Sequence, residues 1–144
     1  METSVKLDLE VFLDSAYLIA LAHPGDEHHI KARQISDGLN AAKTRIITSR
    51  AILIEVGNGL SKLRFRRSAV SLIESLQRSL SVEIVPLGES LCEEGWRLFR
   101  ERTDKEWSWV DCISFVIMHE RGLKQALTTD EHFEQAGFIA LLHQ

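Results

Sequence analysis

Four acidic residues lie within or directly beside apolar segments of the sequence: Asp14, Glu55, Asp111 and Asp130. Carboxylate oxygens are the ligands that Mg²⁺ and Mn²⁺ prefer, and such an ion activates water and stabilises the leaving oxygen of a phosphodiester. Carboxylates that converge to about 5 Å repel each other by roughly 3 kcal/mol per pair at an effective dielectric of about 20. The four acids, if they converge, therefore predict metal-assisted hydrolysis, with one or two divalent cations that keep the carboxylates ionised.

Each of these acids could also have a purely structural role. Asp14 and Asp130 each precede a predicted helix, where aspartate is a favoured N-cap. Asp111 follows Ser108 by three residues, as in a capping box. Glu55 would simply face solvent. For any one acid taken alone, the structural role is the simpler interpretation.

The surroundings of two acids favour a functional role. Glu55 interrupts the apolar run 51–56 and lies on the flank of a helix face formed by Ile52, Leu53, Val56 and Leu60. A glutamate placed there is partly buried, and a buried charge needs a partner. Asp111 opens a helix that is apolar around most of its circumference, so its carboxylate is expected to face a cleft.

Short apolar runs alternate with amphipathic stretches along the chain. Strands are predicted at 11–13, 45–48, 82–85, 125–128 and 138–142. Helices are predicted at 15–22, 28–42, 49–60, 66–80, 89–102, 108–121 and 131–136. The helix over 28–42 is expected to turn four residues toward the core, namely Ile30, Ala32, Ile35 and Leu39. This alternation implies right-handed crossovers and an α/β fold with a mostly parallel five-stranded sheet covered by helices on both faces.

The predicted sheet also indicates where a site would form. In open α/β sheets, ligands bind outside the carboxyl ends of the strands. Asp14 ends the first strand, Asp130 follows the fourth, and Glu55 lies in the helix that leaves the second. Asp111 opens the helix that leads to the fourth strand, so its place at this edge follows less directly.

Composition sets limits on the class of protein. The chain has 144 residues, with 44% hydrophobic and 26% charged residues, which is typical of one globular domain spanning 1–144. Cys92 and Cys112 form no CxxC pair, so a reducing compartment is favoured over a disulfide framework or zinc knuckle. The apolar stretch 16–22 is too short to span a bilayer and follows several acids, which predicts a cytoplasmic protein without membrane attachment. The net charge of −4 equals that of the four acids, so it does not exclude a phosphate-containing substrate.

Segments 11–15, 54–56, 107–112 and 127–133 resemble the PIN-domain family, and most of all its VapC-like toxin branch. The resemblance runs from about residue 11 to 142 and fills all four acid positions in order, with a serine three residues before the third acid and D-x-x-F at the fourth. It implies a three-layer α/β/α PIN-like fold with a parallel sheet, and cleavage of single-stranded or structured RNA that depends on Mg²⁺ or Mn²⁺.

The resemblance also implies roles for individual residues and partners. Asp14, Glu55 and Asp111 would be metal ligands, and Asp130 a more distant ligand or a group that orients water. Thr128 matches a small hydroxyl residue that often precedes the last acid. Family members commonly form homodimers, and many are toxins held inactive by a small antitoxin protein.

Several other residues are candidates for substrate contact. Ser15 and Thr128 flank two of the acids. A basic segment of four residues could track an RNA backbone, receive an acidic antitoxin segment or simply be a solvated helix start; it consists of Lys62, Arg64, Arg66 and Arg67. Trp107 and Trp109 could stack on bases, although at least one is expected in the core.

Histidines and an additional acid are weaker candidates. No H-E-x-x-H is present and the spacing of the histidines disfavours zinc, so His132 is expected at the surface, with substrate contact as an alternative. Asp104 lies near a position where some relatives carry an extra acid, and it is given no role.

The leading hypothesis is a metal-dependent endoribonuclease that acts as the toxin of a type II toxin–antitoxin pair. A housekeeping RNA-processing nuclease or a DNA-directed nuclease would use the same chemistry. A phosphoryl-transfer signalling domain would need an acid paired with Asp14 and a lysine after a later strand, and neither is evident. A non-catalytic nucleic-acid-binding module is disfavoured because such a module has no reason to keep mutually repelling acids.

Overall fold

The chain folds around a five-stranded sheet in which the strands are ordered β3-β2-β1-β4-β5 and every pair of neighbours is parallel. The structure is a computed structural model and describes residues 6–143, so the predicted domain limits at 1 and 144 lie outside the described residues. The strands are β1 (Glu10–Leu13), β2 (Arg45–Ser49), β3 (Val82–Val85), β4 (Gln125–Leu127) and β5 (Ile139–Ala140). The predicted α/β class and parallel sheet are confirmed.

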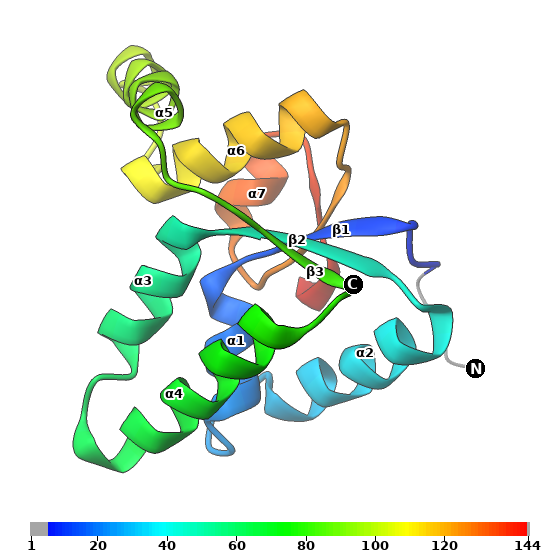
Figure 1. The fold of residues 1–144 in the computed structure, drawn as a ribbon. Coiled ribbons are helices and arrows are strands. Elements are labelled where there is room, and N and C mark those ends of the chain that lie inside the picture. The colour runs from blue at the N-terminus through cyan, green and yellow to red at the C-terminus, as the bar shows by residue number, and fades with distance from the viewer. Residues whose placement is uncertain (1–5, 144) are drawn as a thin grey trace.

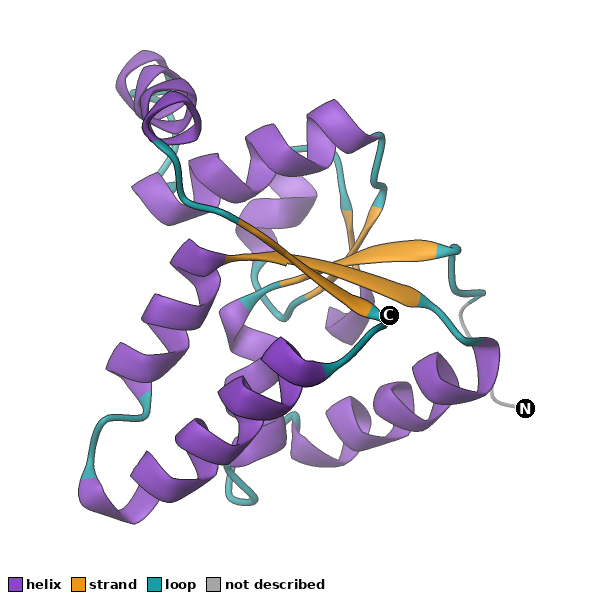
Figure 2. Cartoon of the chain, in the orientation of Figure 1, coloured by secondary structure: helices purple, strands orange, loops and turns teal. Residues whose placement is uncertain are grey.

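Helices cover both faces of this sheet. They are α1 (Ser15–Ala22), α2 (His29–Ala42), α3 (Arg50–Gly59), α4 (Leu63–Arg78), α5 (Glu89–Glu101), α6 (Trp109–Arg121) and α7 (Glu131–Gln135), followed by the short 3₁₀ helix η1 (Leu141–His143). Figure 1 shows α6 and α7 on one side of the sheet and α1, α2 and α4 on the other. Figure 2 shows the same three layers by element type. Among residues 6–143, no helix is both long and apolar enough to cross a bilayer.

The central strand β1 shows how the sheet positions a site. Its residues Val11, Phe12 and Leu13 are apolar and buried, as expected of a strand covered on both faces. Leu13 pairs with Leu127 in β4, and the Asp14 backbone N–H donates to the Leu127 carbonyl at 3.1 Å. This register brings the residues that follow β1 and β4 to one edge.

Two sequence-based predictions of local structure were wrong. Ile30 was expected in the core but is 72% exposed. At about 100° per residue it lies opposite Leu39, which is buried. The last strand was expected over 138–142, but β5 ends at Ala140 and the chain enters η1. Leu141 and Leu142 are both buried in this helical turn.

Helix α5 packs closely against α6 where Gly95 meets Ile113. A Cβ atom added at Gly95 would lie 2.5 Å from Ile113 Cγ1 and 3.2 Å from the Ile113 backbone nitrogen. The absence of a side chain at Gly95 is therefore what lets the two helices approach.

Replacing Gly95 by alanine is expected to lower the free energy of unfolding by about 1–3 kcal/mol, because the added methyl overpacks the helix crossing. The matched control is Gly57→Ala in α3, where an added Cβ meets nothing within 4 Å. That change is expected to raise stability by about 0.5–1 kcal/mol through the ordinary helix preference for alanine. Urea unfolding of both variants measures the difference, and effects of the same sign would contradict this packing account.

Candidate active site

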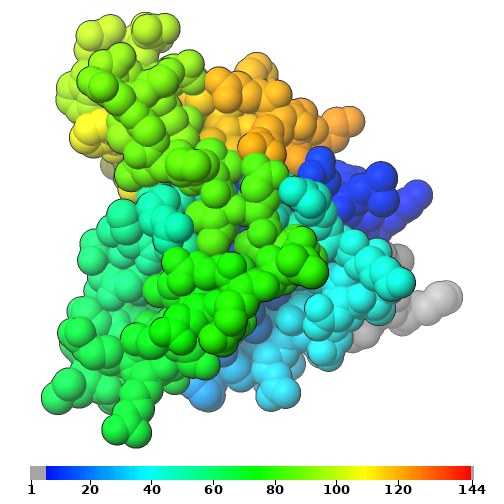
Figure 3. Space-filling model, in the orientation of Figure 1, coloured from blue at the N-terminus to red at the C-terminus, as the bar shows by residue number. Residues whose placement is uncertain are grey.

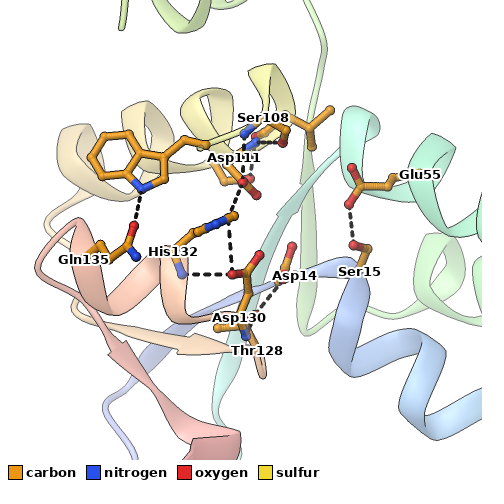
Figure 4. A network of polar contacts seen from close by, with 12 residues as sticks. Asp14, Ser15, Glu55, Ser108, Asp111, Thr128, Asp130, His132 and Gln135 are labelled. Atoms are coloured by element: carbon orange, nitrogen blue, oxygen red, sulfur yellow. Dashed lines mark hydrogen bonds and ion pairs between the residues drawn. The ribbon is translucent and has the colours of Figure 1, made fainter. Parts of the chain in front are cut away.

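The four predicted acids meet at the carboxyl edge of the sheet. Figure 4 shows the carboxylates of Asp14, Asp111 and Asp130 directed toward a common space, with Glu55 facing it from α3. Their charges act on one another: Asp111 and Glu55 raise the pKa of Asp14, and Asp111 and Asp130 raise that of Glu55. The structure therefore assembles all four acids into one electrostatic unit.

Asp14 is the most deeply placed member, with only 4% of its surface exposed. It occupies the N-cap position of α1, yet its side chain makes no capping hydrogen bond. Its Oδ2 instead accepts a hydrogen bond from Thr128 Oγ1 at 2.7 Å. Burial raises the pKa of Asp14 to about 7, reinforced by Asp111 and Glu55 and opposed by the Thr128 bond. The capping interpretation is therefore wrong for this residue.

Thr128 connects two of the acids. Its buried hydroxyl donates to Asp14 and accepts the Asp130 backbone N–H at 3.0 Å. A hydroxyl has one proton, and here Asp14 receives it. The structure thus shows Thr128 orienting an acid, while substrate contact by this residue stays a prediction.

Asp111 combines a structural contact with a position in the cluster. The capping box is confirmed: the Asp111 backbone N–H donates to Ser108 Oγ, and Asp111 Oδ2 accepts from the Ser108 backbone N–H, both at 3.0 Å. These two bonds hold the carboxylate in one orientation at the start of α6. A capping role and a place in the site are therefore compatible.

His132 lies between two of the acids, where the sequence reasoning did not place it. Its Nδ1 is 3.1 Å from Asp111 Oδ2 and 3.3 Å from Asp130 Oδ1. Asp130 also accepts the His132 backbone N–H at 2.8 Å, which confirms its predicted capping role. One ligand atom from each of Asp111, Asp130 and His132 lies within 4.8 Å of the others. The prediction that His132 lies at the surface was wrong. It rested on the sequence spacing between histidines, whereas His132 lies close in space to acids from two different elements.

Glu55 faces the cluster from α3 and contacts Ser15 at the start of α1. Ser15 Oγ donates a hydrogen bond to Glu55 Oε1. Burial raises the pKa of Glu55, as do Asp111 and Asp130, while the Ser15 bond lowers it. The predicted partial burial of Glu55 is confirmed, and the Ser15 hydroxyl orients its carboxylate.

The PIN-domain family model matches residues 11–139, which is most of the chain. This chain belongs to the PIN-domain family. It is 29% identical over 130 residues to the 23S rRNA-specific endonuclease VapC20 of two Mycobacterium tuberculosis strains, a match that covers 90% of this chain and 95% of the relative. The crystal structure of Mycobacterium tuberculosis VapC20, described as a sarcin–ricin loop cleaving toxin, superposes with a TM-score of 0.79 at 28% identity and covers 90% of this chain and 96% of that one.

Two more distant structures share the fold of this PIN domain. FitAcB from Neisseria gonorrhoeae has a TM-score of 0.60 at 19% identity, and the match covers 90% of this chain and 94% of that one. VapBC2 from Rickettsia felis, bound to a DNA fragment from its promoter, has a TM-score of 0.63 at 14% identity, with 91% and 96% covered. Both likenesses confirm the predicted PIN-like three-layer fold.

The basic segment of this PIN domain lies away from the acids. Arg64, Arg66 and Arg67 are exposed in the first turns of α4, at the tip of the hairpin formed by α3 and α4 (Figure 1). Arg66 donates to the Ser61 carbonyl at 2.7 and 3.0 Å, and the Arg64 guanidinium lies over the Phe65 ring at 4.6 Å. The structure does not bring these arginines into the acidic site.

The remaining candidates, one acid and two tryptophans, lie in different environments. Asp104 is exposed and pairs with Arg102, whose hydrogen bonds hold the pKa of that acid at about 2. Trp107 is buried and donates to Gln135 at 3.0 Å, which confirms that at least one of the two tryptophans belongs to the core. Trp109 is exposed beside α5.

Proposed function

We propose that this PIN domain is a metal-dependent endoribonuclease and the toxin of a type II toxin–antitoxin pair. The observation that carries the proposal is the cluster itself: a buried Asp14 with a pKa of about 7 faces Asp111 and Glu55. Carboxylates at this depth stay ionised together only beside a compensating cation, and without one burial favours the protonated acid. The similarity over most of both chains to a 23S rRNA-specific endonuclease supports RNA as the substrate.

The donor set fits Mg²⁺ or Mn²⁺. Asp14, Glu55, Asp111 and Asp130 would hold one or two ions through oxygen, and the His132 imidazole is a donor that Mn²⁺ also accepts. When bound, such an ion lowers the pKa of water and stabilises the leaving oxygen of a phosphodiester.

The protein's own contribution is to orient the carboxylates. Thr128 holds Asp14, Ser15 holds Glu55, and the Ser108 capping box holds Asp111. Hydrogen bonds to the side chains that bind a metal fix the orientation of those side chains and tune their affinity for the ion.

The partners follow from the same proposal. A small antitoxin protein would hold the toxin inactive, and the exposed basic segment containing Arg64, Arg66 and Arg67 would receive either an acidic stretch of that partner or the RNA backbone. We also propose a homodimer that acts in the cytoplasm. A housekeeping RNA-processing role would keep the chemistry and dispense with the antitoxin.

The purified protein is expected to cut RNA internally when Mg²⁺ or Mn²⁺ is present and to stop when EDTA is added, because the bound ion supplies both the activated water and the charge that stabilises the leaving oxygen. Gel analysis of total RNA, ribosomal RNA and a DNA of matched sequence measures both the activity and the preference for RNA. Cleavage that persists in excess EDTA would rule out the metal mechanism, and cleavage of DNA alone would rule out the ribonuclease.

A further inference from the structure

A side-chain hydrogen bond ties the segment that leads into α6 to the C-terminal end of α7. Trp107, directly before the cap residue Ser108, donates its indole N–H to the side-chain oxygen of Gln135 at 3.0 Å. Trp107 is buried, whereas Gln135 is exposed and is the last residue of α7. Figure 4 shows Gln135 at one end of the polar network that contains the acids. The bond therefore joins the two helices on which Asp111 and His132 lie.

Helix α7 also contacts α6 through the residues that precede Gln135. His132 and Gln135 lie three residues apart, so both point from the same face of α7. His132 Nδ1 is 3.1 Å from Asp111 Oδ2. The buried ring of Phe133 packs edge-on against Phe115, with the centroids 5.0 Å apart. The hydrogen bond to Trp107 thus lies on the face of α7 that places the imidazole beside Asp111.

Aromatic packing holds the indole in place on the same face of α6. Phe115 meets the Trp107 ring edge-on, with the centroids 5.0 Å apart. Asp111 and Phe115 are four residues apart and share one face of α6, while Ile113 lies on the other face and packs against α5. Figure 3 shows α5, in yellow-green, on the outside of the molecule at this end. Helix α6 is therefore held by α5 on one face and by Trp107 and α7 on the face that carries Asp111.

The position of α7 depends on these contacts because the helix has only five residues. An isolated helix shorter than about 12 residues is marginal in water, so α7 takes its orientation from its neighbours. A displacement of α7 would move Asp130 and His132 together relative to Asp111. Groups that act together on an ion must be held to within about 0.5 Å of their working geometry. The contacts that hold α7 against α6 therefore bear directly on the site.

We propose that the hydrogen bond between Trp107 and Gln135 is a brace that holds α7 against the start of α6. The brace sets the distance from Asp111, on α6, to Asp130 and His132 at the start of α7. Trp107 and Gln135 are thus positioning residues, which act on a bound ion through the groups that they align. This inference rests on the proposed metal-dependent function and adds two residues that tune the site.

The brace is tested first at Gln135, which is exposed and can be changed without disturbing the core. Gln135→Met keeps the length of the side chain but offers only a weakly accepting thioether, whereas Gln135→Glu keeps an oxygen acceptor. The EPR signal of free Mn²⁺ measures ion binding without RNA. We expect Gln135→Met to weaken Mn²⁺ binding about 10-fold, as the loss of residues that orient metal ligands does, and Gln135→Glu to retain the affinity of the wild type.

A double-mutant cycle separates the hydrogen bond from other effects of these changes. Trp107→Phe keeps an aromatic ring and removes the N–H donor, so in this background Gln135→Met should weaken Mn²⁺ binding no further. Gln135→Glu should no longer differ from Gln135→Met there, which excludes its added charge as the cause of retained binding. The matched control is Gln77→Met, an exposed glutamine of α4 on the other side of the sheet, which should bind Mn²⁺ like the wild type.

Cleavage and unfolding of the same variants distinguish alignment of the site from a purely structural bond. At a fixed, subsaturating Mn²⁺ concentration, Gln135→Met should lower kcat with little change in the KM for RNA. Gln135→Met that unfolds at lower urea than the wild type but binds Mn²⁺ equally well overturns the inference. Equal and additive losses of Mn²⁺ affinity from Trp107→Phe and Gln135→Met also overturn it, because the two residues would then act separately.

Failure of this inference and failure of the proposed function give different results. RNA cleavage by the wild type together with unchanged Mn²⁺ binding by Gln135→Met removes only the brace. Mn²⁺ binding that depends on Gln135, without any cleavage of RNA by the wild type, removes the ribonuclease and keeps the brace. A wild type that binds no Mn²⁺ overturns both.

Discussion

Replacing Asp14 by asparagine is expected to stabilise the metal-free protein above neutral pH and to flatten the dependence of its stability on pH. Burial raises the pKa of Asp14 from 3.8 to about 7, so the folded protein keeps a proton that the unfolded chain releases. Between these values the folded state binds more protons, and stability therefore falls as pH rises. The difference between 3.8 and about 7 corresponds to about 4 kcal/mol, at about 1.4 kcal/mol for each tenfold change in proton affinity.

Urea unfolding in EDTA at pH 5 and pH 8 measures this effect. The wild type should lose stability between the two values, and Asp14→Asn, which carries no charge to bury, should lose much less. Asp104→Asn is the matched control, because Asp104 is an exposed acid outside the cluster and should leave the slope unchanged. A wild type that is as stable at pH 8 as at pH 5 without metal would contradict the buried-charge account.

Asp14 also makes the stability of the folded protein depend on the bound ion. Mg²⁺ or Mn²⁺ binds the ionised carboxylates of the folded protein and stabilises it by mass action. The ion should therefore return at pH 8 the stability that ionisation of Asp14 removes from the wild type. Asp14→Asn should gain less from the ion, since it offers the site one carboxylate fewer.

Elements with strong local signals were predictable from the sequence, and contacts between distant segments were not. Helix α1 was predicted at its observed bounds, because an apolar run ends in His23-Pro24-Gly25. The Asp14 carboxylate, in contrast, is bound by Thr128, which is 114 residues away along the chain. Aspartate before a helix is locally a cap, and only the pairing of β1 with β4 supplies the competing donor.

The residues of the candidate site also differ in whether local sequence could predict them. The acids could be chosen because each interrupts or borders an apolar segment, and the parallel sheet could be expected to collect those that follow its strands. His132 carried no such signal. Its place depends on the first turn of α7 lying beside that of α6, a tertiary contact that no spacing rule between histidines describes.

Replacing Asp111 by asparagine is expected to lower the rate of RNA cleavage by at least about 1,000-fold, because losing a charged metal ligand forfeits several kcal/mol of transition-state stabilisation. The fold should survive. An asparagine oxygen can still accept the Ser108 backbone N–H that Asp111 Oδ2 accepts now, so the capping bonds of α6 remain available. We therefore expect the free energy of unfolding to change by less than about 1 kcal/mol.

The measurement is the single-turnover cleavage rate at saturating Mn²⁺, with circular dichroism and urea unfolding of the same samples. Asp104→Asn again serves as the control, since it removes an acid from the neighbouring loop and should cut RNA like the wild type. Growth of a bacterial host extends the comparison: the wild type should arrest it and Asp111→Asn should not. Retained cleavage in a folded Asp111→Asn would show that the charge of Asp111 serves only the helix cap. It would leave Asp14, Glu55 and Asp130 as the acids to which an ion must bind.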